Sequence, residues 1–376
     1  MTPEAARAFL VSHHALAVPA FPVGHAGVRA VLERLRCIQV DPLDPMGTNA
    51  DLVAMARVDG LGKGDVYRAL LPSHAFEHFA KERCLLPASA FPYYRAQAHE
   101  TPWWRHSERM TKLSPELIAA VRDEIAERGP LAAGALTDRG RIEPMDWAGW
   151  KGTSKAATLA LEVLWTRCEV VVSDRTGKDK RYDLPERALP DVVAAEATED
   201  FATWALLERV EAAGLLAETS GPWWSMLASV RTSGLATRLV AEGRLERVAL
   251  TGLKRSFLVP AGFRDRPVAA PDDRMRLLGP LDPLIWNREL VRHVFGFDYV
   301  WEVYKPAAQR KFGWYVCPLL HRGRLVGRLE ARLEQNVLRV LKVWPEDGMT
   351  LDPEALRACL ERHATALGAE AVSGLE

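Results

Sequence analysis

The hydrophobic positions near the start of the chain repeat with the period of a helix and then give way to an extended segment. An i, i+3, i+4, i+7 spacing of apolar residues predicts an amphipathic helix with one buried face. The residues with this spacing are Val28, Val31, Leu32 and Leu35. The next stretch, Cys37-Ile38-Gln39-Val40-Asp41-Pro42, ends in a proline, which disfavours helical backbone at the preceding residue. We therefore predict an extended segment in which Gln39 and Asp41 project from the same face.

A helix followed by a β-hairpin is predicted twice in the middle of the chain. In the first copy, Ser154 can cap a helix that runs to Trp165, and strands follow over 169–173 and 181–184. The second copy has a helix over 235–240 and strands over 244–250 and 256–259. This weak internal repeat is typical of tandem winged helix-turn-helix units, although a helix and a hairpin can also follow one another in other α+β proteins.

The remaining segments are read from turn residues and β-branched or aromatic runs. The first hundred residues read as proline-broken helices, and a further helix is expected from Ser114-Pro115-Glu116. Residues 261–274 read as a linker, and an acidic helical tail follows Pro345. Between them we expect a small antiparallel sheet or barrel with strands over 299–304, 314–320, 324–330 and 337–343.

Composition indicates a soluble globular protein with more than one packed unit. The 376 residues carry 49 basic and 49 acidic side chains, so any surface for nucleic acid must be local. Five scattered cysteines without a C-x-x-C pair argue against a disulfide framework, a zinc ribbon or an iron–sulfur cluster. No apolar run is long enough to span a bilayer and no leader is recognised, so we expect a cytoplasmic protein.

One region does depart from charge neutrality. Between Trp301 and Trp344 there are nine basic and three acidic residues, a local excess of six positive charges. The segment from Tyr304 to Phe312 carries three of them, Lys305, Arg310 and Lys311. These cations could contact phosphates while an apolar side chain wedges against bases, or the segment could be an exposed loop of a barrel.

The hairpin of the first helix–hairpin copy also has a basic tip. In winged-helix proteins one helix enters the major groove and the hairpin contacts the backbone, where lysine and arginine neutralise phosphates. The residues that fit this role are Arg175, Lys178, Lys180 and Arg181. The alternative is a solvated hairpin with no partner.

The motif at Gln39 and Asp41 allows two interpretations. An amide and a carboxylate side by side can hold and polarise one water molecule. Alternatively, Asp41 only forms the turn before Pro42 and Gln39 is an ordinary strand residue.

Other catalytic patterns are weak or absent. His74 and His78, four apart on an expected helix, resemble half of a metal site, but no third ligand is near in sequence, so we expect no metal and no cofactor. The chain has no G-x-S-x-G motif, phosphate-binding loop or dinucleotide fingerprint.

Several longer segments resemble the winged-helix DNA glycosylases of the AlkZ and YcaQ (AlkX) type, over nearly the whole chain. The matching segments are Leu35 to Pro42, Phe76 to Ala80 with Leu85-Leu86-Pro87, Arg181 to Glu186, Leu281 to Arg288, Phe295-Gly296-Phe297, Trp301 to Tyr304 and Gly313-Trp314-Tyr315. The resemblance implies an α+β protein with three tandem winged-helix units and a C-terminal β-barrel, C-shaped around duplex DNA. We expect these units at residues 1–112, 113–190, 191–262 and 263–376.

The resemblance also implies a reaction. This family excises alkylated bases and unhooks interstrand crosslinks, with a Gln-x-Gln motif in the AlkZ branch and Gln-x-Asp in the YcaQ branch. Gln39 and Asp41 match the motif of the second branch. The resemblance therefore implies activity on N7-alkylated purines and assorted crosslinks. Asp41 would then stabilise the oxocarbenium-like sugar and activate water that Gln39 orients. No lysine adjoins the motif in sequence to form a Schiff base, so we expect a monofunctional, metal-independent glycosylase.

Two departures from the family concern residues close to the motif. Many relatives have Phe-Glu-Tyr-Trp-Ala-His where this chain has Phe76-Glu77-His78-Phe79-Ala80-Lys81, and a His pair where it has Thr48-Asn49-Ala50-Asp51. Both departures bear on the range of lesions. The rival interpretation is a non-catalytic tandem winged-helix regulator, which explains the wings and the basic region but gives the motif no task. A metal-dependent nuclease would need a carboxylate cluster that the sequence lacks. We expect the partner to be duplex DNA and the protein to act as a monomer.

Overall fold

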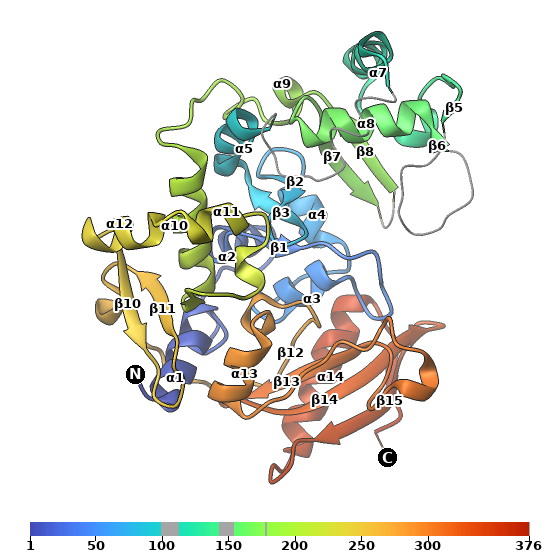
Figure 1. The fold of residues 1–376 in the computed structure, drawn as a ribbon. Coiled ribbons are helices and arrows are strands. Elements are labelled where there is room, and N and C mark those ends of the chain that lie inside the picture. Colours follow the sequence, from blue (N-terminus) through green and yellow to red (C-terminus); the bar gives the residue numbers. More distant parts are fainter. Residues whose placement is uncertain (99–112, 143–153, 177–178, 376) are drawn as a thin grey trace. The chain divides into compact units, whose positions relative to one another are not determined.

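The protein is an α+β molecule, as the sequence predicts. The computed structural model describes residues 1–98, 113–142, 154–176 and 179–375. The chain divides into two compact units, each assembled from separate stretches of sequence (Figure 1). The first comprises Met1–Val66, Ala80–Cys84 and Ala205–Glu376, and the second Tyr67–Phe79 and Leu85–Trp204. Within the described ranges, no helix has the length and apolar character needed to cross a bilayer.

The N-terminal part of the first unit contains the predicted amphipathic helix and extended segment. Its elements are α1 (Pro3–His13), α2 (His25–Leu35), β1 (Ile38–Gln39) and α3 (Asn49–Met55); α4 (Asp65–Leu70) follows at its edge. Helix α2 buries all four predicted apolar positions and ends at Arg36, which has a left-handed φ of 61°. The extended chain then pairs with the start of β3 (Arg83–Pro87), because Val40 N–H donates to the carbonyl of Arg83 at 2.9 Å. The prediction of a helix followed by a short strand is confirmed.

The second predicted helix–hairpin copy lies between α10 and β11. Helix α10 (Phe201–Ala213) leads to β9 (Leu216–Ala217), α11 (Ala228–Thr232), α12 (Leu235–Ala241), β10 (Leu245–Ala249) and β11 (Ser256–Pro260). The strands form a sheet in the order β10-β11-β9, with Leu245 opposite Pro260 and Ala249 opposite Ser256. The predicted helix and both predicted strands are therefore confirmed at the expected places.

A five-stranded sheet forms the C-terminal part of the first unit. Its elements are β12 (Arg276–Leu277), α13 (Arg288–Phe295), β13 (Val316–His321), β14 (Arg324–Glu334), β15 (Val337–Pro345), α14 (Pro353–Leu367) and β16 (Ala371–Ser373). Strands β12 to β15 are antiparallel neighbours in sequence order, and β16 runs parallel to β15. Helix α14 packs on one face of this sheet, where Leu356 and Leu360 join one core with Leu329 (Figure 1).

One strand predicted for this region is wrong. Residues 299–304 have irregular and turn backbone, followed by a 3-10 turn at Ala307–Gln309. The carboxylate of Glu302 accepts the backbone N–H groups of Lys311 and Phe312 at 3.1 and 2.9 Å. These bonds tie Glu302 to the loop that follows, and residues 299–304 belong to no strand of the sheet.

The second unit contains the first helix–hairpin copy. Its elements are β2 (Ala75–Phe79), the end of β3, α5 (Phe91–Gln97), α7 (Pro115–Arg128), β4 (Leu131–Ala132), β5 (Arg141–Ile142), β6 (Ser154–Lys155), α8 (Ala156–Thr166), β7 (Val171–Thr176), β8 (Asp179–Asp183) and α9 (Pro185–Ala188). Ser114 caps α7 through the N–H of Leu117, as predicted. Ser154 does not cap α8, because it lies in β6 and pairs with Ile142. His78 lies in β2, so the helix expected for the histidine pair is also wrong.

Candidate active site

Gln39 lies at the end of β1 with its side-chain amide held in place. Its Oε1 accepts a hydrogen bond from the Nζ of Lys81 at 3.0 Å, and its carbonyl accepts one from Asn49 Nδ2 at 2.9 Å. The side chain is buried, with 7% of the residue exposed. With Oε1 engaged, the amide N–H groups are the part of Gln39 left to contact another molecule.

A buried amide connects this strand to the Leu281 segment. Asn49 is fully buried, and its Oδ1 accepts the N–H of Leu281 at 3.0 Å while its Nδ2 binds the carbonyl of Gln39. The approach is close enough to require glycine at position 279, since a Cβ there would lie 2.6 Å from Asn49 Oδ1. Two segments far apart in sequence are thereby held together behind the motif.

A buried ion pair anchors the same segment. Asp282 accepts two hydrogen bonds from Arg57, at 2.7 and 3.0 Å, and neither side chain is exposed. Asp282 also caps the short turn Pro283–Ile285 by accepting the N–H of Leu284. Because removing one member of a buried pair leaves an uncompensated charge, this pair makes the backbone behind the motif rigid.

Asp41 follows Gln39 just beyond the end of β1 and is half-buried. Its Oδ1 accepts the N–H of Leu43 at 2.9 Å, which is the turn that the sequence predicts before Pro42. Its Oδ2 has no hydrogen-bond partner among the residues that the structure describes. Burial raises the pKa of the carboxyl above its usual value, against the opposing effect of the Leu43 N–H. A turn-forming role for one oxygen therefore leaves the other available to a water molecule.

The structure adds a lysine to the motif. Lys81 is 42 residues from Gln39, yet its Nζ bonds to Gln39 and lies 5.1 Å from the ring centroid of Trp286. No carboxylate lies within salt-bridge distance of Lys81 among the described residues. No lysine lies next to the motif along the sequence, as expected, but the fold brings Lys81 into contact with it. One feature of the sequence could have pointed to Lys81: it stands where the resembling proteins often have the last histidine of Phe-Glu-Tyr-Trp-Ala-His.

A second buried cation lies close enough to influence Lys81. Arg288 donates to the carbonyl of Pro280 at 3.2 Å and lies over the ring of Tyr299, while its Nη1 is buried without a hydrogen-bond partner. Burial lowers the pKa of Arg288 to about 10. Burial also lowers the pKa of Lys81; the charge of Arg288 adds to the effect, whereas Cys84 and Glu82 oppose it. Two cations without a carboxylate partner among the described residues therefore accompany Gln39. The name motif corner is used below for Gln39, Lys81, Trp286 and Arg288, together with Asp41, which follows Gln39 in the chain.

The hairpin of the second unit differs from the predicted basic wing. Arg175 is buried and donates two hydrogen bonds to the carboxylate of Glu77, at 2.7 and 3.1 Å. This pair leaves its guanidinium no exposed face for a phosphate, which corrects the expectation for Arg175. Lys180 lies 3.9 Å from Glu77 and Arg181 is exposed. Lys178 lies outside the described residues.

The basic loop after Glu302 also carries an exposed aromatic side chain. Lys305 pairs with Glu302 at 2.8 Å, Arg310 donates to the carbonyl of Lys305 at 2.8 Å, and Lys311 is exposed. Burial disfavours the charged form of Glu302, but Lys305 and the loop N–H groups outweigh it and lower its pKa to about 2. Tyr304 is 84% exposed. Glu302 thus closes a loop that carries an exposed ring among positive charges.

No group of three metal-binding side chains is found in the described parts of the chain. His78 is buried, stacks on Trp165 with the ring centroids 5.1 Å apart, and its Nε2 bonds to the carbonyl of Thr166 at 3.1 Å. These contacts give His78 a packing role within the second unit.

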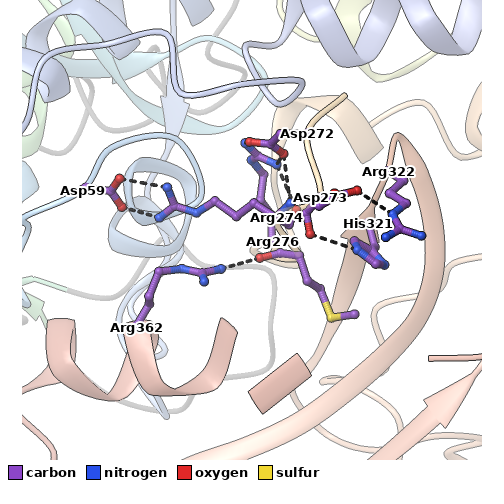
Figure 2. Close-up of polar contacts among 9 residues, drawn as sticks. Asp59, Asp272, Asp273, Arg274, Arg276, His321, Arg322 and Arg362 are labelled. Atoms are coloured by element: carbon purple, nitrogen blue, oxygen red, sulfur yellow. Dashed lines mark hydrogen bonds and ion pairs between the residues drawn. The ribbon is translucent and has the colours of Figure 1, made fainter. Parts of the chain in front are cut away.

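Three arginines, Arg274, Arg276 and Arg362, line a cavity of about 220 Å³ elsewhere in the first unit, and Arg322 lies outside its lining. Arg274 pairs with Asp59, Arg276 with Asp272, and Arg322 with Asp273 (Figure 2). Arg362 donates to the carbonyl of Met275 at 2.7 Å. The arginine cluster, as Arg274, Arg276, Arg322 and Arg362 are called below, therefore has a defined protein acceptor for every member.

Comparison with known proteins places this arrangement in a family. The fold is similar to that of the Streptomyces sahachiroi DNA glycosylase AlkZ, with a TM-score of 0.61 and 18% sequence identity over 99% of each chain. The sequence matches the family described as DNA glycosylase AlkZ-like over residues 32–370, which include Gln39, Asp41, Lys81 and the Leu281 segment. The chain therefore belongs to the AlkZ-like DNA glycosylase family and is a DNA glycosylase of DNA repair.

Proposed function

We propose that this glycosylase hydrolyses the N-glycosidic bond of N7-alkylated purines in duplex DNA and unhooks interstrand crosslinks formed through such bases. Alkylation at N7 places a positive charge on the purine, so the base leaves readily without a general acid. A carboxylate and a positioned water are then sufficient for the reaction. The observation that carries the proposal is that Gln39 is fixed by Lys81 while Asp41, two residues later, keeps one carboxylate oxygen without a protein partner.

The two motif residues take different roles in this mechanism. Asp41 stabilises the positive charge that develops on the sugar and accepts a proton from the attacking water. Its half-buried position and raised pKa make it a stronger base than an exposed aspartate. Gln39, whose Oε1 is occupied by Lys81, orients the water through its amide N–H groups.

DNA binding is assigned to the two basic hairpin or loop regions, each in its own unit. In the first unit, Lys305, Arg310 and Lys311 would contact phosphates, and the exposed ring of Tyr304 would stack against a base. In the second unit, Lys178, Lys180 and Arg181 keep the predicted wing role, which Arg175 loses. We assign winged-helix units to residues 1–112, 113–190 and 191–262, and a C-terminal barrel to residues 263–376.

Crosslinked substrates impose a further requirement. A base joined to the opposite strand cannot swing freely into a closed pocket, as most glycosylases require. An open site that reaches the lesion in the groove is therefore part of the proposal. We further propose that one copy of the chain in the cytoplasm acts on each lesion.

Base release is the direct test of this proposal. Duplexes with a single N7-methylguanine are incubated with the protein in EDTA, and the free base is measured by chromatography. A nitrogen-mustard crosslinked duplex is followed in parallel as separated strands on a denaturing gel. Release of both kinds supports the proposal, whereas tight binding with no released base would support a non-catalytic regulator.

Asp44→Asn is a matched control for Asp41→Asn. Asp44 lies three residues from Asp41 and pairs with Lys63 at 2.8 Å, so its substitution removes a nearby charge without touching the motif. Loss of base release in Asp41→Asn but not in Asp44→Asn is expected. Equal loss in both variants would contradict the assignment of the reaction to Asp41.

A further inference from the structure

We propose that Lys81 gives this glycosylase a second activity, the cleavage of DNA at the abasic site through a Schiff base between Nζ and C1′ of the sugar. The inference rests on the proposed function, because it places the abasic sugar beside Gln39. It replaces the expectation of a monofunctional enzyme, which depended on the absence of a lysine next to the motif along the sequence.

The position of Lys81 is built by several contacts within the first unit. Its backbone lies in the turn before β3, where Ala80 N–H donates to the carbonyl of Glu82 and Ser225 Oγ donates to the carbonyl of Lys81. Its Nζ bonds to Gln39 and lies over the ring of Trp286. Trp286 is itself held by its Nε1–H bond to the carbonyl of Leu281 at 2.7 Å. These contacts hold the amine of Lys81 beside Gln39.

The charge environment of Lys81 differs from that of Lys63 and Lys305. Lys63 and Lys305 each pair with a carboxylate at 2.8 Å, and a carboxylate holds an amine in its charged form. Lys81 instead contacts an amide and an aromatic ring, and the charges of Arg288 and Glu82 act on it from nearby. Burial, helped by Arg288 and opposed by Cys84, Glu82 and Cys37, lowers the pKa of its amine, which increases the fraction present as the free base. A free amine is the form that attacks an aldehyde.

The chemical steps balance without any additional reactant. After base loss, the open-chain abasic sugar has an aldehyde at C1′, and the Nζ lone pair adds to this carbon. Loss of water gives the protonated imine. Asp41 then takes a proton from C2′, and the electron pair expels the 3′ phosphate as the C3′–O bond breaks. Hydrolysis of the conjugated imine consumes one water molecule and regenerates Lys81.

The test uses DNA in which the abasic site already exists, so that it is independent of base release by this protein. A uracil-containing duplex is treated with a separate uracil glycosylase, and the full-length protein is added with sodium cyanoborohydride, which reduces an imine to a stable amine. The expected result is a covalent protein–DNA complex whose modified peptide contains Lys81. Without the reductant, the strand is cut on the 3′ side of the abasic site.

Three variants separate the proposed role from its alternatives. Lys81→Met and Lys81→Arg should reduce trapping and cutting to the level of DNA without an abasic site, and Lys81→Arg keeps the positive charge. Lys63→Met is the control, because Lys63 pairs with Asp44 at 2.8 Å and lies outside the regions assigned to DNA binding. It should trap like the unchanged protein.

The outcomes distinguish this inference from the proposed function. No complex with the unchanged protein, or equal trapping after Lys81→Met, overturns the lyase activity even if N7-methylguanine is released. Trapping through Lys81 without release of N7-methylguanine would support the lyase activity. It would contradict the proposal that N7-alkylated purines are substrates of the glycosylase. If Lys81 only positions Gln39, its variants slow base release while the unchanged protein forms no covalent complex, which also overturns the inference.

Discussion

The motif corner and the arginine cluster are both rich in buried or half-buried cations, apart from the exposed Arg322, but their charges are compensated differently. In the arginine cluster, three arginines each have a carboxylate partner and the fourth has a backbone carbonyl (Figure 2). In the motif corner, neither Lys81 nor Arg288 has a carboxylate within salt-bridge distance among the described residues. The Nη1 of Arg288 is also buried without a hydrogen-bond partner. The number of positive charges therefore does not distinguish the two regions, whereas the pairing does.

The physical reason is the cost of removing a charge from water. A buried cation is destabilising unless an anion and hydrogen bonds compensate it. The arginine cluster meets this condition and is explained by stability alone. The motif corner does not, and groups with shifted pKa values and unsatisfied charge collect at functional sites. The following variants test this difference, from the largest expected effect to the smallest.

Asp41→Asn should lower the rate of base release by about 10²–10⁴, the usual value of general-base assistance. DNA binding should persist because the substitution removes no phosphate contact. The raised folded-state pKa of Asp41 means that its ionised form opposes folding at neutral pH, so the variant should melt at a higher temperature. Single-turnover kinetics measures the rate and calorimetry the melting temperature. A lower melting temperature would contradict the view that the half-buried carboxylate of Asp41 is kept for function at a cost in stability.

Asp272→Asn should have the opposite signature. It leaves Arg276, which is 5% exposed, without its carboxylate, and an unsatisfied buried group costs about 1–3 kcal/mol. Denaturant unfolding should record this loss, while the rate of base release by the folded protein stays unchanged. A slower reaction at full occupancy of the folded state would show that the arginine cluster takes part in catalysis.

The pH dependence of base release should reveal the environment of Asp41. Since burial raises its pKa above the reference of about 3.9, the ionised fraction falls at a higher pH than for an exposed aspartate. Below that pKa the rate should fall about tenfold for each pH unit. Single-turnover rates between pH 4 and 8 measure the limb, and an inflection at or below the ordinary aspartate value would contradict the burial effect.

Lys311→Met should weaken binding to duplex DNA uniformly, because an exposed lysine on a phosphate contributes to affinity without reading sequence. The slope of log K against log salt should become shallower by about one. Titrations at several salt concentrations provide the measurement, with Lys63→Met, which removes a lysine already paired with Asp44, as the control. An unchanged slope would remove Lys311 from the DNA interface.

Arg274→Gln should have the smallest effect. Its partner Asp59 is 47% exposed, and ion pairs at such positions contribute about 0–1 kcal/mol. The stability should therefore change by no more than about 1 kcal/mol, and the rate of base release should stay unchanged. A large effect on activity would make the cavity beside Arg274 a functional site.

Local structure was largely predictable from the sequence. Apolar spacing placed α2, capping by Ser114 placed the start of α7, and alternation placed β10 and β11. These elements depend on residues close in the chain, where period and capping preferences act directly. The strand predicted at residues 299–304 is absent, and Glu302 within this segment instead bonds to the N–H groups of Lys311 and Phe312 in the loop that follows.

The composition of the site was decided only by tertiary structure. The sequence by itself determined the Gln39–Asp41 motif and the family to which its long matches point. It could not show that Lys81 reaches Gln39, or that Glu77 removes Arg175 from the hairpin surface. Burial and pairing depend on which distant segments meet, and a charge has the same letter in the sequence whether it faces water, a carboxylate or an amide. Only the folded chain therefore showed which cations are paired with carboxylates and which contact an amide or an aromatic ring instead.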